Sequence, residues 1–321
     1  MDDFWSDKRI LVTGGSGFLG RRLIEKLRAR GAREIASPRS NEYDLTQRDQ
    51  VEKLFANVTP DVVIHLAARV GGIGMNVNRP AELYTTNLLM GTYVIEEARL
   101  RSTFKTVLIG TICSYPNQTP VPFKEDALWD GYPEITNAPY GVAKKALLVH
   151  AQANRQQFGQ KSIYLMPVNL YGPGDKFHPS VSHVIPALIK KCVDAVERGD
   201  DVLEVWGTGR ATREFLYVDD AAEGIALATE QYDDPAPLNL GSGEEISIAD
   251  LASLVARLVG FEGELRFDPS KPDGQPRRRL DVTRAKQAFG FEAKVPLEEG
   301  LRRTIEWYRA HQDEATTVQV D

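Results

Sequence analysis

Cysteine, long apolar runs and repeated segments are scarce or missing in this chain. Its 321 residues include only two cysteines, Cys113 and Cys192, which are too few for a disulfide framework and typical of a reducing compartment. No apolar run is long enough to span a bilayer, no segment repeats, and the first residues are acidic. We therefore expect neither a membrane anchor nor a secretory leader, and we expect the protein to be cytoplasmic.

An excess of positive charge is missing as well. Lysine and arginine number 39 against 45 for aspartate and glutamate, which gives a formal net charge of −6. Such a chain lacks the basic footprint with which proteins bind nucleic acids or anionic membranes. We predict no nucleic-acid partner and no metal site, so a local cluster of arginines needs a local explanation.

Glycine, in contrast, is concentrated directly after the first apolar segment. The run 9–13 is apolar, Gly14, Gly17 and Gly20 follow at a spacing of three, and apolar residues then recur at helical spacing. Glycine there lets the backbone approach a pyrophosphate, while the helix N-terminus offers N–H donors to the anion. This strand, loop and helix predict a dinucleotide site.

The segment after the second expected strand, 34–37, bears on which dinucleotide binds. An acidic residue at this point would bond the ribose of NAD and would repel a 2′-phosphate. The chain has Arg39 and Ser40 instead, and these can bind a phosphate, which favours NADP. The alternative is that Arg39 is a solvated turn residue.

Alternation of apolar strands and helices through the first half predicts the fold class. We expect an α/β protein with a Rossmann-type, doubly wound parallel sheet and a smaller, mostly C-terminal α/β substrate-binding domain. The expected strands include 61–68 and 106–110, the expected helices 82–101 and 140–158, and 70–76 is expected to be a flexible loop. The NADP-binding domain is predicted to span 1–170 plus about 214–242. The substrate-binding domain is predicted to span about 171–213 plus 243–310, followed by a polar tail, 311–321.

Tyr140 and Lys144 carry the first chemical signal. They lie one turn apart on the expected helix and share a face. A lysine ammonium and a nicotinamide cation nearby would lower the pKa of the phenol, so that Tyr140 could exchange a proton with a carbonyl oxygen while hydride moves. Thr111 adds a hydroxyl at the end of a strand, where parallel sheets place ligands. A chance surface pair is the alternative, which the glycine loop and Thr111 disfavour.

With these residues the chain resembles the extended short-chain dehydrogenase/reductases, and within them the GDP-L-fucose synthases. The closer likeness lies in Cys113 and in five segments, 65–74, 169–173, 182–188, 213–215 and 270–274. The resemblance implies an NADPH-dependent enzyme that converts GDP-4-keto-6-deoxy-mannose to GDP-L-fucose by epimerisation at C3 and C5 and reduction at C4. It also implies a homodimer formed through 82–101 and 140–158.

The resemblance implies roles for five catalytic residues. Tyr140, with Lys144 beside it, and Thr111 would hold the C4 oxygen, which stabilises each enolate and then assists hydride addition. Inversion of a carbon needs proton transfer on both faces of the ring, and the implied groups are Cys113 as base and His183 as acid. Related dehydratases carry a glutamate base where this chain has Cys113, so the cysteine favours epimerisation over dehydration.

Further residues are expected around the two ligands. The resemblance implies cofactor contacts by Gly14, Ser16, Gly17, Phe18, Leu19, Gly20, Arg39, Asp44, Leu45, Leu66, Ala67, Ala68, Tyr140, Lys144, Asn169, Leu170 and His183. It implies contacts with the GDP-linked ketosugar by Val184, Lys191, Trp206, Arg213 and Arg278. Arg213 and the arginine run containing Arg278 can clamp a diphosphate through bidentate contacts, and Trp206 can stack on the base or sugar or simply pack.

Two departures from the family pattern keep other substrates open. Thr111 stands where serine is usual, and Arg278 stands where lysine is expected. One alternative is a C4 reductase, or a 3,5-epimerase/4-reductase, of another nucleotide ketosugar such as a heptose or another deoxysugar. Another is an NADP-binding regulatory protein without turnover, although such proteins typically lose the Tyr/Lys pair that is present here.

Overall fold

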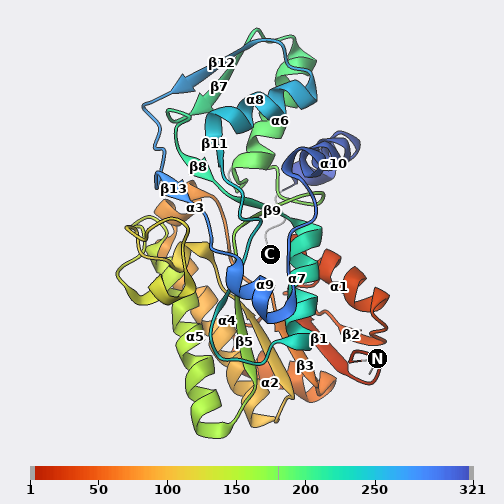
Figure 1. The fold of residues 1–321 in the computed structure, drawn as a ribbon. Coiled ribbons are helices and arrows are strands. Elements are labelled where there is room, and N and C mark those ends of the chain that lie inside the picture. The colour runs from red at the N-terminus through yellow and green to blue at the C-terminus, as the bar shows by residue number, and fades with distance from the viewer. Residues whose placement is uncertain (1–3, 180, 318–321) are drawn as a thin grey trace.

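A six-stranded parallel sheet forms the centre of the computed structural model, which describes residues 4–179 and 181–317 (Figure 1). Its strand order is β10-β5-β4-β3-β1-β2, and every neighbouring pair is parallel. This confirms the predicted Rossmann-type fold. The strands are β1 (Arg9–Thr13), β2 (Glu34–Ala36), β3 (Val62–His65), β4 (Lys105–Ile109), β5 (Ser162–Pro167) and β10 (Leu238–Leu240).

Helices cover both faces of this sheet. On one face α4 packs against α2 and α5, and on the other α1 packs against α7. The central strands are mostly apolar because both faces are buried, as in β3, where all four residues are buried. The helices are α1 (Phe18–Ala29), α2 (Arg48–Val58), α4 (Pro80–Leu100), α5 (Ala138–Phe158) and α7 (Val218–Gln231). In the described part of the chain no helix is long and apolar enough to cross a membrane.

The strand order reverses between β1 and β3. The chain leaves β1 for β2 on one side, and the strands from β3 to β5 are then added on the other side. Ligands of doubly wound sheets bind at such a point, beyond the carboxyl ends of the strands. The glycine loop follows β1 and the segment 66–68 follows β3, so both predicted cofactor segments lie at this point.

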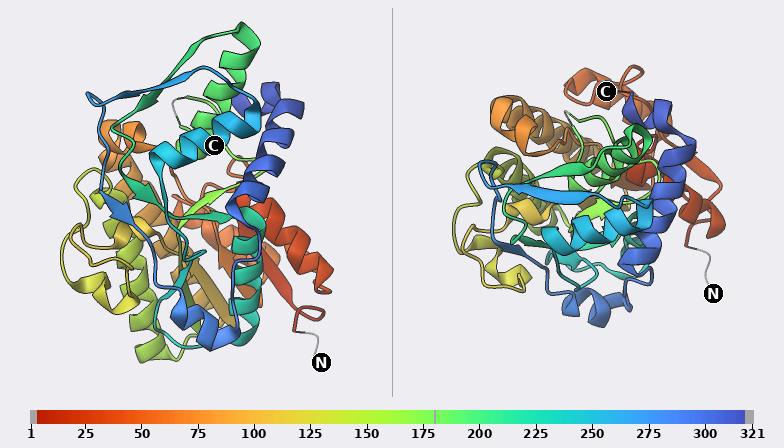
Figure 2. Two further views of the ribbon diagram at one scale, coloured as in Figure 1. Left: turned by 45° about the horizontal axis from the view of Figure 1, so that its top comes forward. Right: turned by 90° about the horizontal axis from the view of Figure 1, so that it is seen from above.

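A second group of elements lies at one end of the molecule (Figures 1 and 2). It has its own hydrophobic core, to which residues between Tyr171 and Ala315 contribute. Three small sheets pair β6 with β9, β7 with β12, and β8 with both β11 and β13. The strands are β6 (Asn169–Tyr171), β7 (Val202–Trp206), β8 (Thr212–Arg213), β9 (Phe215–Tyr217), β11 (Ile246–Ser247), β12 (Glu264–Asp268) and β13 (Arg277–Arg278), and the longer helices are α6 (Val184–Arg198), α8 (Ile248–Val259) and α10 (Leu297–Ala310).

Three segments differ from the sequence expectations. The expected loop 70–76 contains the start of α3 (Ile73–Asn78), because the Asn76 amide donates to the carbonyls of Gly71 and Gly72 and closes the turn. Helix α9 (Thr283–Phe289), expected in the smaller domain, packs against β10 and α7 through Phe289 and joins the core of the large sheet.

The third difference concerns the expected polar tail. Residues 312–316 form a short helix, α11 (Gln312–Thr316), in which Ala315 is buried and its carbonyl accepts the N–H of Phe177 at 3.1 Å. One apolar side chain and one backbone hydrogen bond therefore fix this segment. Residues 318–321 of that tail lie outside the described residues.

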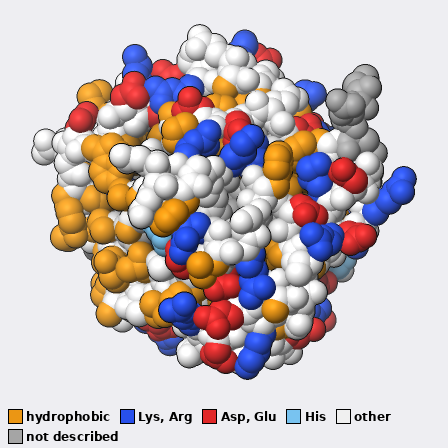
Figure 3. Space-filling view, turned by 90° about the horizontal axis from the view of Figure 1, so that it is seen from below, with side chains coloured by type: hydrophobic (Ala, Val, Ile, Leu, Met, Phe, Trp, Pro, Cys, Tyr) orange, Lys and Arg blue, Asp and Glu red, His pale blue; other side chains and the backbone are white. Residues whose placement is uncertain are grey.

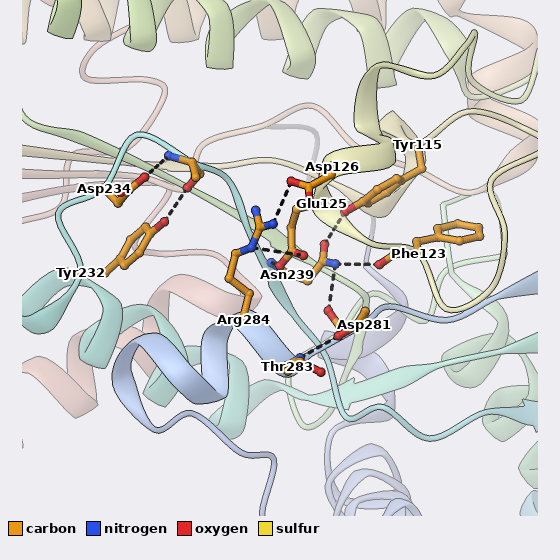
Figure 4. Close-up of polar contacts among 11 residues, drawn as sticks. Tyr115, Phe123, Glu125, Asp126, Tyr232, Asp234, Asn239, Asp281, Thr283 and Arg284 are labelled. Atoms are coloured by element: carbon orange, nitrogen blue, oxygen red, sulfur yellow. Dashed lines mark hydrogen bonds and ion pairs between the residues drawn. The ribbon is translucent and has the colours of Figure 1, made fainter.

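Asn239 on β10 is the centre of a buried polar network (Figure 4). Its side-chain oxygen accepts the Tyr115 hydroxyl at 2.7 Å, and its amide donates to the carbonyls of Phe123 and Asp281 at 2.9 and 3.0 Å. Its backbone N–H donates to Glu125 at 3.0 Å, and Arg284 on α9 lies 3.8 Å from the other Glu125 oxygen. Glu125 begins the short helix η2 (Glu125–Trp129). Three distant segments are thus fixed to the edge strand of the sheet.

We predict that Asn239→Leu destabilises the protein by about 3 kcal/mol, because it removes the partner of the buried Tyr115 hydroxyl and the side-chain donor of two carbonyls, of which Phe123 keeps the Asp281 N–H. Tyr115→Phe, which removes one of these hydrogen bonds, is the matched comparison and should lower stability by about 1 kcal/mol. Urea unfolding monitored by circular dichroism measures both values. Equal losses for the two variants would contradict the central position of Asn239.

Candidate active site

The loop after β1 forms a tight cradle beside the segment after β3. Gly14 has a positive φ of 70°, and a Cβ there would lie 2.8 Å from the backbone nitrogen of Ala67. A Cβ on Gly20 would overlap the Gly14 carbonyl oxygen and the Gly15 Cα, so α1 begins directly against the loop. This is the close packing that a dinucleotide loop requires, and any Cβ at these two positions would clash with backbone atoms.

His65 ends β3, directly before the segment that lines this cradle, and is a core histidine. It is buried, and its Nδ1 shares a hydrogen bond of 2.8 Å with the Thr13 hydroxyl, which also accepts the N–H of Ala67 at 3.3 Å. Burial, followed by the charge of Lys144, lowers the pKa of His65 to about 3. His65 is therefore neutral and holds the ends of β1 and β3 together.

The segment after β2 approaches the same loop. A Cβ on Gly15 would overlap the Ser37 side chain, so Ser37 lies directly against the glycine loop. Arg39 is exposed, and its backbone N–H donates to Glu42 at 2.8 Å. Within residues 4–179 and 181–317 its guanidinium has no hydrogen-bond or ion-pair partner. Further along, Asp44 is exposed and accepts the Thr46 N–H, and Leu45 is buried.

Helix α5 packs directly on the short helix η1 (Ile112–Ser114), which follows β4. A Cβ on Gly141 would overlap the Cys113 carbonyl oxygen, and the Ser114 hydroxyl donates to the Gly141 carbonyl at 3.0 Å. Gly141, next to Tyr140, thus contacts Cys113, which is two residues after Thr111. These backbone contacts bring together Tyr140, Thr111 and Cys113, which lie on two separate segments.

Thr111 is the N-cap of η1 and is held in one orientation. Its hydroxyl oxygen accepts the N–H of Cys113 at 3.2 Å. A hydroxyl that accepts in this way keeps its own proton available for a second partner. Thr111 is therefore able to donate a hydrogen bond to an oxygen atom beyond the end of β4.

Tyr140 and Lys144 lie together, with the lysine Nζ 6.0 Å from the centre of the phenol ring. Burial raises the pKa of Tyr140, and the neighbouring Cys113 raises it further. Burial also lowers the pKa of Lys144 to about 8. Desolvation of the phenolate is the largest cause of the Tyr140 shift, while the predicted lowering of its pKa depends on a nicotinamide cation as well as on the lysine and stays a prediction. Tyr140 is a neutral phenol and a proton donor.

Two guanidinium groups lie beside Cys113. Arg278 is only 9% exposed, and its Nη1 lies 3.7 Å from the Cys113 sulphur while its Nε donates to Gln275 at 2.8 Å. Arg213 donates to the carbonyls of Thr212 and Asp273. Burial, and then the charge of Arg278, lowers the pKa of Arg213 to about 10. Neither guanidinium forms an ion pair with a carboxylate in the described part of the chain, and two such charges need an anion.

Glu214 holds the strands that carry these arginines. It is fully buried, and its carboxylate accepts the backbone N–H groups of Leu280 at 2.6 Å and Gly243 at 2.8 Å. Its own backbone N–H donates to the Arg278 carbonyl, and its carbonyl accepts the Asn169 amide. Burial raises the pKa of Glu214 to about 7, although the backbone donors oppose the rise. The Glu214 carboxylate thus fixes the segment after β13, and its backbone joins β13 to β6, where Asn169 and Leu170 lie.

His183 stands exposed at the N-terminus of α6, directly before Val184. A Cβ on Gly72 would lie 2.9 Å from the Ser182 carbonyl, so the His183 segment packs against the loop after β3. Desolvation by the surrounding protein, followed by the Lys176 charge, lowers the pKa of His183.

Trp206, the last residue of β7, has an exposed ring that lies between two lysines. The Nζ atoms of Lys191 and Lys271 lie 5.4 and 5.6 Å from the centre of the ring.

Sequence reasoning missed several residues that shape this site. Asn87 on α4 is buried, and its amide bonds both the N–H and the carbonyl of Arg69, which fixes the segment after β3. Gln275 orients Arg278, and Ser37 lies against Gly15. Asn87 could have been found as a lone amide among the apolar residues of an expected helix. The positions of Gln275 and Ser37 depend on contacts that sequence spacing does not reveal.

We predict that Gly20→Ala weakens NADPH binding by at least about tenfold, because the added methyl group overlaps backbone atoms that cannot move aside as a flexible side chain can. Fluorescence titration of the purified variant measures the dissociation constant. Gly131→Ala is the matched control, because a Cβ there makes only an ordinary contact of 3.4 Å with Pro116. An unchanged dissociation constant for Gly20→Ala would rule out the cradle as the cofactor site.

Comparison with known proteins places this geometry in a family. A model of the NAD dependent epimerase/dehydratase family matches residues 10–241. GDP-L-fucose synthase 1 of Arabidopsis thaliana is 41% identical over 305 residues, which cover 94% of each chain.

Two solved structures share the fold along their whole length. A GDP-L-fucose synthetase from Naegleria fowleri bound to NADP has a TM-score of 0.89 at 28% identity and covers 97% of this chain and 96% of its own. A GDP-6-OMe-4-keto-L-xylo-heptose reductase from C. jejuni has a TM-score of 0.90 at 28% identity and covers 96% and 99%. The family model spans both the glycine cradle and the Tyr140 helix, and the chain therefore belongs to the NAD dependent epimerase/dehydratase family.

Proposed function

We propose that this protein epimerises GDP-4-keto-6-deoxy-mannose at C3 and C5 and reduces it at C4 with NADPH, which yields GDP-L-fucose. The observation that carries the proposal is the grouping of Tyr140, Thr111 and Cys113 by the contact of α5 with η1, beside the buried Arg278 and the half-buried Arg213, neither of which has a carboxylate partner in the described chain. A relative named GDP-L-fucose synthase, 41% identical along nearly the whole chain, supports this substrate.

NADP(H) fits the cradle at the carboxyl ends of β1 and β3. Gly14 and Gly20 let the loop pack tightly against the segment after β3 and the start of α1, where any Cβ would clash with backbone atoms, and the exposed Arg39 suits a 2′-phosphate. When bound, this cofactor supplies the hydride for C4. Its further proposed contacts are Ser16, Gly17, Phe18, Leu19, Asp44, Leu45, Leu66, Ala67, Ala68, Asn169, Leu170 and His183, together with Tyr140 and Lys144.

Tyr140 and Thr111 act on the C4 oxygen in every step of the proposed reaction. Because C3 and C5 both flank the C4 carbonyl, donors on this oxygen stabilise each enolate and later the alkoxide. The neutral Tyr140 phenol then gives its proton to the reduced oxygen, and the Lys144 ammonium favours the phenolate that is left. Cys113 removes the proton from the ring carbon, and His183 returns one to the opposite face.

Arg213 and Arg278 provide the cationic side of the substrate site. A diphosphate would supply the negatively charged partner that these two guanidinium groups do not have within the described protein. Trp206, exposed between Lys191 and Lys271, offers a ring on which the guanine base can stack, and Val184 lies at the start of the helix that carries Lys191.

Two domains divide this work. We assign cofactor binding to residues 1–170 and about 214–242, extended by the segment around α9 that packs on the large sheet. Substrate binding falls to about 171–213 and to the remainder of 243–310, whose core is separate. The two cysteines form no disulfide, which suits the cytoplasm.

A second candidate substrate is a GDP-linked ketoheptose. The similarity to a heptose reductase, with a TM-score of 0.90, favours it. The same Tyr140 and Thr111 would reduce C4 there, and Cys113 and His183 would serve only if the substrate is also epimerised. Product analysis separates the two functions.

Two variants should separate the two halves of the reaction when GDP-4-keto-6-deoxy-mannose and NADPH are supplied in D₂O. Tyr140→Phe should slow NADPH oxidation by about 10²- to 10⁴-fold, because the proton donor is lost. Cys113→Ser should suppress deuterium incorporation at C3 and C5, observed by NMR, while NADPH still binds. A wild-type protein that fails to oxidise NADPH with every nucleotide ketosugar tested, the GDP-linked ketoheptose included, would refute the enzyme function.

The outer faces of α4 and α5 suggest how two copies assemble. Several large apolar side chains on these helices are exposed, namely Tyr84, Leu100, Val149 and Phe158. Figure 3 shows hydrophobic side chains gathered on the side of the molecule where Figure 1 places α5. Exposed apolar area of this kind marks an interaction surface, and we propose a homodimer formed through these helices.

We predict that multi-angle light scattering gives the mass of a dimer for the wild-type protein and of a monomer for Val149→Glu. A charge in the centre of an apolar interface remains without a partner and opposes association. The control is Val202→Glu, which changes another exposed valine, on β7, and this variant should remain dimeric. A monomeric wild-type protein would exclude the proposed assembly.

A further inference from the structure

The contact between Arg278 and the Cys113 sulphur reaches beyond diphosphate binding. We propose that Arg278 stabilises the thiolate form of Cys113 and is therefore a catalytic residue of the epimerisation. The inference rests on the proposed function, in which Cys113 is the base. In this proposal Arg278 keeps Cys113 deprotonated before any substrate binds.

Geometry leaves the guanidinium few other partners. Its Nη1 lies 3.7 Å from the Cys113 sulphur, its Nε donates to the neutral Gln275, and its side chain is buried. No carboxylate of the described chain segments lies within ion-pair distance of it. A buried guanidinium stabilises a nearby anion strongly, and the half-buried sulphur is the atom here that becomes an anion by losing a proton.

The other groups that face Cys113 add to this positive environment. Arg213 on β8 is a second cation, whose pKa is lowered first by burial and then by Arg278, and Tyr140 on α5 is neutral. Three carboxylates act on the two arginines, namely Glu134 on Arg278 and both Asp273 and Glu245 on Arg213. Each of them already has other partners: Glu134 accepts from Thr136 and Asn137, Asp273 accepts from Thr208, and Glu245 pairs with Arg277. The Arg278 guanidinium thus keeps the Cys113 sulphur as a close partner that can carry negative charge.

The backbone holds Arg278 in this place independently of any ligand. Arg278 pairs with Arg213 across the parallel strands β13 and β8, and its carbonyl accepts the N–H of Glu214 at 3.1 Å. Three residues later the Asp281 carbonyl accepts from Asn239, whose oxygen binds Tyr115, two residues after Cys113. Both sides of the contact are thus tied to one buried amide, so the guanidinium and the sulphur keep their spacing.

The proposed step balances as follows. The thiolate takes the proton from the ring carbon, the electron pair of that C–H bond forms the enolate, and the negative charge moves onto the C4 oxygen beside Tyr140 and Thr111. The sulphur becomes a neutral thiol, and the Arg278 charge loses its anion. This favours release of the thiol proton to solvent, so the same residue serves at the second carbon.

Alkylation of the full-length, substrate-free protein by iodoacetamide tests the proposal, because the thiolate is the form that reacts. The rate at Cys113 is followed by mass spectrometry from about pH 5 to pH 10. Arg278→Gln should slow labelling at neutral pH by about tenfold and shift the rate profile to higher pH. Arg278→Lys keeps the charge and should retain most of the wild-type rate.

Arg277→Gln is the matched control. Arg277 is adjacent in sequence, but it is exposed and its guanidinium pairs with Glu245, so its removal should leave the labelling profile unchanged. Cys192 is fully buried, and its labelling in any variant reports unfolding. An Arg278→Gln protein that stays folded and labels at Cys113 like the wild type would overturn the proposal.

Thiolate absorbance gives a test that needs no arginine variant. The ultraviolet difference between wild type and Cys113→Ser should show a thiolate already present at neutral pH. A signal that develops only near the pH of an ordinary thiol, about 8.5, would overturn the proposal. Neither measurement contains substrate or NADPH. A thiolate can therefore be found even if the GDP-ketosugar assay shows no activity, and activity can be found without a thiolate at neutral pH. The proposed function and the role of Arg278 are thus tested separately.

Discussion

The contact between Gly141 and the Cys113 carbonyl determines the rest of the site. It exists because Gly141 has no side chain, so α5 can touch the turn that ends β4. With this contact Tyr140, Thr111 and Cys113 come from adjacent elements of a rigid sheet, without help from any long loop. The Gly14 contact with Ala67 does the same for β1 and β3. Missing Cβ atoms just after β1 and in the first turn of α5 therefore set the positions of both the cofactor cradle and the proposed reacting groups.

Around Arg213 and Arg278 the site depends instead on like charges that are held close together. The buried Arg278 guanidinium and the half-buried Arg213 guanidinium repel each other, and in the described structure no carboxylate pairs with either. Such an arrangement opposes folding and persists because surrounding contacts hold it, here the Glu214 carboxylate and the Asn239 amide with their backbone partners. A bound diphosphate or a thiolate relieves the repulsion. The protein thus keeps an unsatisfied positive charge where an anion is needed.

The sequence allowed prediction of those features that depend on local spacing. The glycine loop, the sheet and the Tyr140 and Lys144 pair follow from residues within a few positions of each other. The network of Tyr115 with Asn239 could not be predicted, because its members are 124 positions apart and neither belongs to a spaced motif. Helix α9 was expected in the wrong domain for the same reason, since its Phe289 packs across the chain onto the large sheet. The raised pKa of Tyr140 depends on burial, which spacing does not measure.

The distance along the chain between Cys113 and Arg278 has a consequence for how the protein folds. The two side chains that meet at 3.7 Å are separated by 165 positions, and Arg278 comes from the last quarter of the sequence. Contacts of such high sequence separation form late, because the intervening chain must first be ordered. During synthesis the sheet and the glycine cradle can assemble while Cys113 still lacks its cationic neighbour. In a chain that has not closed its C-terminal segments Cys113 therefore lacks the Arg278 contact, and the proposed base is complete only in the finished molecule.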